Sequence, residues 1–64
     1  MFMIAIKTKA ANDNSEFKNS ELSKGWVNNG HGYLTIKDSS EGTLRKLASV
    51  LFREYGLESR VFEI

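Results

Sequence analysis

Apolar and polar residues alternate at the start of the chain and predict a β-strand over residues 2–9. Phe2, Ile4 and Ile6 fall on one face of this strand. The opposite face also begins with an apolar residue, Met3. Because both faces are partly apolar, we expect a central strand or a partly covered edge of a sheet.

A polar segment follows over residues 10–24, and only Phe17 and Leu22 could anchor it to a core. Unstructured segments of this length are uncommon inside compact domains, where they are usually functional, mobile or built around a short element. We therefore expect a long polar loop here. A short strand or helical turn around residues 15–22 is the alternative.

The dipeptide Asn29-Gly30 predicts a β-hairpin within residues 25–37. A two-residue type I′ turn needs positive φ at both central positions, which asparagine and glycine tolerate. This turn would place Trp26 directly opposite Tyr33. One face of the hairpin would then carry Lys24, Trp26, Asn28, His31, Tyr33, Thr35 and Lys37. The other face would carry Val27, Leu34 and Ile36.

Residues 38–55 have the pattern of an amphipathic helix. Asp38 is the expected N-cap, with Glu41 three residues later as in a capping box. Gly56 is expected to end the helix, and Leu57 to pack against its last turn. The apolar stripe at helical spacing consists of Leu44, Leu47, Ala48, Leu51 and Tyr55, with Phe52 widening it.

A last strand is expected over residues 58–64, with Phe62 and Ile64 reaching the core. The element order is then strand, loop, strand, strand, helix, strand. One helix covers only one face of a sheet, so we expect an α+β domain of two layers. Its small, mainly antiparallel sheet would have three to four strands, and residues 1–64 would form a single domain.

The composition excludes several classes of protein. The chain has 64 residues, no cysteine, one histidine and a formal net charge of +1. A disulfide framework and thiolate metal sites are excluded, and we expect neither a metal nor another cofactor. No apolar run approaches the ~20 residues that span a bilayer, so we expect a cytoplasmic protein without membrane contact. A core this small gives a thin stability margin, which makes a homo-oligomer about as plausible as a monomer.

The hairpin face is the main candidate for binding. A Trp26–Tyr33 pair between Lys24 and Lys37, with Asn28, His31 and, from the polar loop, Phe17, could anchor a protein partner or stack on bases. The same aromatic pair could simply stabilise the hairpin. A secondary basic patch on the helix comprises Arg45, Lys46 and Arg53. These side chains could contact phosphates or form an ordinary solvated helix face.

His31 is the only histidine and the only plausible catalytic residue. It would need an acid–base partner, and the nearby candidates are Tyr33, Lys37 and a carboxylate from the polar loop. An exposed turn histidine is the alternative. Gly30-His31, followed by the run Glu41-Gly42-Thr43-Leu44-Arg45-Lys46-Leu47 and by Gly56-Leu57, is similar to the second half of HicA-type mRNA interferases. The likeness covers about a third of the chain, and it implies that His31 would cleave RNA.

These patterns favour a small non-enzymatic binding module that acts through protein contact, such as an inhibitor or adaptor of the phage or mobile-element type. Two alternatives remain open. One is a protein that binds single-stranded RNA or DNA through the aromatic sheet face, and the other is a HicA-like ribonuclease that depends on His31.

Overall fold

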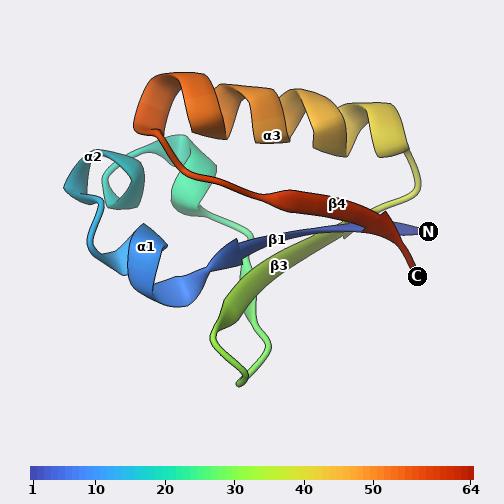
Figure 1. Cartoon of the computed structure of the whole chain (residues 1–64), viewed down its shortest axis with the longest axis horizontal. Coiled ribbons are helices and arrows are strands. Elements are labelled where there is room, and N and C mark those ends of the chain that lie inside the picture. Colours follow the sequence, from blue (N-terminus) through green and yellow to red (C-terminus); the bar gives the residue numbers. More distant parts are fainter.

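The computed structural model describes residues 1–64 and has two layers, a four-stranded antiparallel sheet and one long helix across one of its faces (Figure 1). The predicted two-layer α+β fold is thereby confirmed. The main elements are β1 (Phe2–Lys7), β2 (Val27–Asn28), β3 (Tyr33–Asp38), α3 (Glu41–Tyr55) and β4 (Arg60–Glu63). No helix has the length and apolar character needed to cross a bilayer.

The strand order across the sheet is β2-β3-β1-β4. β1 is central and runs antiparallel to both β3 and β4, so these two flanking strands run parallel to each other. Helix α3 connects β3 to β4 and lies across one face of the sheet (Figure 1). The chain termini lie side by side, and the Ile64 amide donates a hydrogen bond of 3.0 Å to the Met1 carbonyl.

The core lies between β1 and α3. Ile4 and Ile6 project from β1 toward the helix and are almost wholly buried, as are Leu44 and Leu51 on the helix. The cross-strand partners Ile36, Leu34 and Val61 extend this apolar face and pack against the same cluster. The predicted strand alternation and the centre of the helical stripe are therefore correct, whereas Phe52 is 62% exposed and does not widen the stripe.

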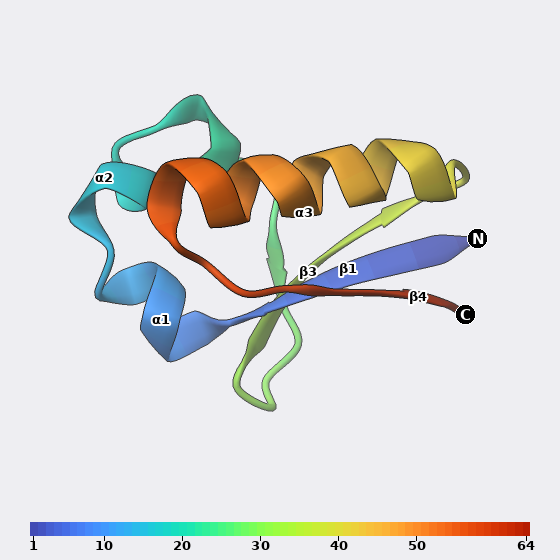
Figure 2. The same cartoon turned by 45° about the horizontal axis from the view of Figure 1, so that its top comes forward.

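The polar segment forms three short helical elements in place of the expected loop (Figure 2), which agrees with the alternative of a helical turn around residues 15–22. They are α1 (Thr8–Asn12), α2 (Ser15–Lys18) and the 3₁₀ turn η1 (Glu21–Ser23). Ala11 and Phe17 anchor them in the core. The Asn14 side chain caps α2 by accepting from the Phe17 amide at 3.0 Å, and it donates to the Tyr55 carbonyl at 2.8 Å. One side chain thus joins this segment to the end of α3.

The hairpin differs from its predicted register by three residues. Val27 pairs with Thr35 and Asn28 with Leu34, and residues 29–32 connect the strands. Because the Asn29 amide donates to the Tyr33 carbonyl at 3.0 Å, the turn itself consists of Gly30-His31-Gly32. An odd shift moves side chains to the opposite face of the sheet. Val27 therefore points away from the core and is 65% exposed.

Interactions of neighbouring residues determine where α3 begins and ends. Ser40, and not Asp38, is the N-cap: its side chain accepts from the Thr43 amide at 3.3 Å. Asp38 is the last residue of β3 and accepts from the Ser40 amide at 2.7 Å. At the other end Gly56 adopts the left-handed conformation, and Leu57 is buried behind it, as expected.

The side chains of β4 face the opposite sides of the sheet from those that were predicted. Val61 pairs with Ile4 and packs against the core, so Phe62 points to the other face. Phe62 is 41% and Ile64 54% exposed. The expectation that these two residues reach the core is wrong, because the pairing with β1 fixes which side chains face the helix.

Gly56 permits a stability prediction. Its φ is +67°, and no heavy atom would contact an added Cβ, so Gly56→Ala changes only the backbone preference. We expect a loss of about 1–2 kcal/mol in the free energy of unfolding, measured by urea denaturation. Gly42 is helical without positive φ, so Gly42→Ala is the matched control and should stabilise the protein by up to about 1 kcal/mol.

Candidate functional site

The sheet face turned away from α3 has no covering element, and we call it the open face. Its side chains follow from the pairing register: Lys7 lies opposite Tyr33, and Met3 lies between Lys37 and Phe62. A further row crosses all four strands and contains Val27, Thr35, Ala5 and Arg60. The residues at the centre of the open face, such as Ala5 and Thr35, are small or apolar. The longer side chains of this face surround them.

Two aromatic side chains stand on the open face, and each is 41% exposed: Tyr33 on β3 and Phe62 on β4. They lie on the two strands that flank β1. Their pairing partners on β1, Lys7 and Met3, are four residues apart. Strand geometry puts them about 16 Å apart. Each has a cationic neighbour on the same face, because Tyr33 lies opposite Lys7 and Phe62 is two residues from Arg60 on β4.

Charge is segregated across the sheet. The charged strand residues on the open face are all basic, namely Lys7, Lys37 and Arg60. The acidic strand residues Asp38 and Glu63 share the opposite face with Phe2. None of the three basic side chains forms an ion pair, since the salt bridges in the protein are Lys24–Glu21 and Arg45–Glu41. The open face therefore presents three uncompensated positive charges.

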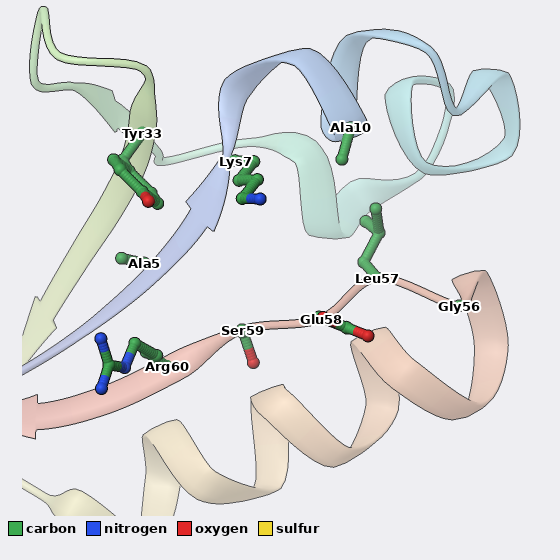
Figure 3. A pocket seen from close by; sticks show the side chains of 9 residues that line it. All are labelled: Ala5, Lys7, Ala10, Tyr33, Gly56, Leu57, Glu58, Ser59 and Arg60. Carbon is green, nitrogen blue, oxygen red and sulfur yellow. The ribbon is translucent and has the colours of Figure 1, made fainter.

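A pocket lies at the end of the open face where β4 separates from β1 (Figure 3). It has a volume of about 390 Å³. Ala5 lies at its floor, and Tyr33, Lys7 and Arg60 surround that small side chain. Ala10 and the segment 56–59, which includes Glu58, line the other end.

The predicted Trp26–Tyr33 pair does not form. Trp26 lies on the helix side of the sheet, where its ring packs edge-on against Phe17 with centroids 6.3 Å apart. Its Nε1 donates to the Leu22 carbonyl at 2.6 Å. Phe17 is 2% exposed and belongs to the core, so its ring is not available at the surface. Of the predicted face, Tyr33, Thr35 and Lys37 do lie together.

The remaining predicted residues of that face have other positions. Lys24 follows η1 and pairs with Glu21 at 3.4 Å. The Asn28 side chain accepts from the Gly30 amide at 2.9 Å and so shapes the turn. His31 is exposed at the tip of this turn, where its backbone amide donates to the Asn29 side chain at 2.7 Å. The His31 ring makes no hydrogen bond to another residue.

The secondary basic patch lies on the solvent side of α3. Arg45 is held by Glu41 at 2.7 Å, whereas Lys46 and Arg53 are exposed without an ion pair. The open face is on the other side of the sheet from this helix (Figure 2). The two sets of basic residues therefore point in different directions.

Sequence reasoning missed Phe62, Lys7 and Arg60 as members of one surface. The signal is present in the alternation of each strand, since Met3 and Lys7 fall on one face of β1 and Arg60 and Phe62 on one face of β4. What was missing was the pairing of these strands. No group of three or more His, Asp and Glu side chains comes together at metal-binding distances.

The chain was compared with models of protein families, with curated protein sequences and with solved structures. None of these comparisons returned a match.

Proposed function

We propose that the open face binds single-stranded RNA or DNA. Bases stack on Tyr33 and Phe62, and the phosphates of the same strand contact Lys7, Lys37 and Arg60. An open sheet with exposed aromatic side chains is one of the common ways in which proteins hold unpaired bases. Stacking needs the flat face of a base, which a double helix hides between neighbouring base pairs, so the preferred ligand is single-stranded.

The observation that carries this proposal is the alternation of aromatic and uncompensated basic groups on one uncovered surface. A solvated sheet face would be expected to mix both signs of charge, yet the charged strand residues here are all basic. The separation of about 16 Å between Tyr33 and Phe62 is too large for one base to contact both rings. Two bases of an extended strand would occupy them.

The basic residues set the expected salt dependence. Each phosphate that is neutralised on a single strand contributes about −0.7 to the slope of log K against log salt. Three contacts from Lys7, Lys37 and Arg60 therefore predict a slope of about −2. Fluorescence anisotropy with a labelled oligonucleotide of mixed sequence, titrated between low and physiological salt, measures it.

The triple variant Lys7→Gln/Lys37→Gln/Arg60→Gln should bring this slope close to zero and weaken binding at low salt. The matched control is Lys18→Gln/Lys46→Gln/Arg53→Gln, which removes the same charge from exposed helical positions. It should keep a slope near that of the native chain. Equal slopes for the two triple variants would contradict the proposed surface, because general charge attraction would then explain the binding.

A second candidate is a protein partner on the same face, for a module of the inhibitor or adaptor type. The observation that favours it is apolar exposure beside the aromatic rings, with Val27 65% and Ile64 54% exposed. In addition, the outer edge of β4 has no neighbouring strand. Failure of oligonucleotides to bind even at low salt, together with a partner captured by the native chain and lost on Phe62→Ala, would favour this candidate.

A further inference from the structure

We propose that the pocket over Ala5 binds a terminal phosphate, either the phosphorylated end of a nucleic-acid strand or a free nucleoside monophosphate. This inference rests on the proposed function, because it assigns the place where a bound strand ends. The reason lies in which groups line the hollow.

The pocket combines two unpaired cations with an aromatic ring. Lys7 and Arg60 both line it and neither has an ion-pair partner. The Tyr33 ring stands beside Lys7 (Figure 3), and Ser59 also lines the hollow, with its hydroxyl directed toward α3. A phosphate monoester carries more negative charge than an internal phosphodiester, and it also has an additional oxygen to accept hydrogen bonds. Two basic side chains around one hollow suit the monoester better.

The depth of the pocket comes from a small side chain. Ala5 pairs with Thr35 on one side and Arg60 on the other, so it stands in the row that crosses the whole sheet. A volume of about 390 Å³ lies within the range of ~300–1,000 Å³ that is typical of small-ligand sites. A single nucleotide is a ligand of this class.

Ala10 on α1 and Leu57 lie across from each other at the end of the pocket away from the sheet (Figure 3). A strand that runs over the open face would reach the pocket from the side of Tyr33 and Arg60, and we place its last nucleotide there. The two unpaired cations favour the doubly charged phosphate of a last nucleotide over an internal phosphodiester at this place.

Glu58 also lines the pocket, and its carboxylate would oppose an anion placed next to it. In Figure 3 the Glu58 side chain is directed away from Arg60 and Tyr33. The phosphate is consequently assigned to the part of the hollow that Lys7 and Arg60 border. Glu58→Gln should leave binding of the phosphate intact or tighten it.

The experiment compares three oligonucleotides of one sequence that end in a 5′-phosphate, in a 3′-phosphate or in hydroxyl groups only, and adds a free nucleoside monophosphate. Binding is followed by isothermal titration and by NMR shifts of the Ala5, Tyr33 and Ser59 amides. We expect one phosphorylated end to raise affinity about tenfold over the hydroxyl-ended strand. The free monophosphate should shift the same amides and should compete with that end.

Two variants examine the pocket itself. Ala5→Leu fills the hollow and should abolish the preference for the phosphorylated end. Because Ala5 is partly buried, circular dichroism must show that this variant is folded. Lys7→Gln changes an exposed side chain without that risk and should reduce the preference as well. Lys18→Gln, at an exposed position of α2, is the control that should retain it.

The outcomes separate this inference from the proposed function. If strands bind equally well with every type of end and the free monophosphate causes no shifts, the terminal-phosphate site is wrong while the open face stands. If the monophosphate binds but no oligonucleotide does, the proposed function is wrong and the pocket is a nucleotide site. If neither ligand binds, both proposals are wrong.

Discussion

Phe17→Ala is expected to leave a large fraction of the protein unfolded at room temperature. The Phe17 ring is 2% exposed and contacts Trp26 and Tyr55 edge-on, with centroid distances of 6.3 and 5.8 Å. Truncating a buried phenylalanine costs about 3–5 kcal/mol. A domain of 64 residues has a total stability of only about 3–10 kcal/mol at typical values per residue.

The control is Phe52→Ala, which removes the same side chain from a position that is 62% exposed. Its effect should stay within about 0.5 kcal/mol. Urea denaturation followed by circular dichroism gives both free energies of unfolding. Similar costs for the two variants would mean that residues 8–24 do not anchor the fold through Phe17, contrary to the packing described above.

Regular periodicity is the part of the fold that could be predicted from sequence. The alternation in β1 and the spacing of Leu44 and Leu51 each correspond to one buried face. These patterns are local, and the structure that each predicts depends on few distant contacts. The sequence signal of Gly56 followed by Leu57 is local in the same way, and it correctly marks the end of α3.

The hairpin register could not be predicted from the turn alone. Asn29-Gly30 favours a two-residue turn, but Gly32 also takes positive φ, at +92°, and allows a turn that is longer by one residue. The Asn29 side chain accepts from the amides of His31 and Tyr33 at 2.7 and 3.2 Å and stabilises this longer turn. The observed register places the Trp26 ring against the core, where it buries a large apolar surface. That tertiary gain outweighs the local turn preference.

Which side chains of β4 face the core could not be predicted from the sequence, for a related reason. Val61, Phe62 and Ile64 are all apolar, so the sequence offers either face of this strand to the core. Only the pairing of Val61 with Ile4 decides between them. Because the candidate surface consists of side chains from three strands, it depended on two such long-range pairings. This is why the residues that β1 and β3 each place on one face were predicted correctly, whereas their assembly with β4 into one open face was not.

Loss of both exposed rings should have the largest effect on binding. Tyr33→Ala and Phe62→Ala should each weaken binding of a single strand by about 1–3 kcal/mol, since each removes one stacked base. At a separation of about 16 Å the two effects should add, so the double variant should lose about 2–6 kcal/mol. Anisotropy titrations of the two single variants and the double variant at low salt measure this sum.

Two controls separate stacking from other causes. Tyr33→Phe keeps the ring, so it should bind nearly as well as the native chain if stacking dominates, whereas a loss as large as that of Tyr33→Ala would assign the contact to the hydroxyl. Phe52→Ala removes an exposed ring from α3 and should not change binding. Both rings on the open face are exposed, so these truncations should alter affinity with little change in stability. A double variant that loses no more affinity than one single variant would mean that a strand contacts only one of the rings. The proposal that two bases of one strand occupy Tyr33 and Phe62 would then be wrong.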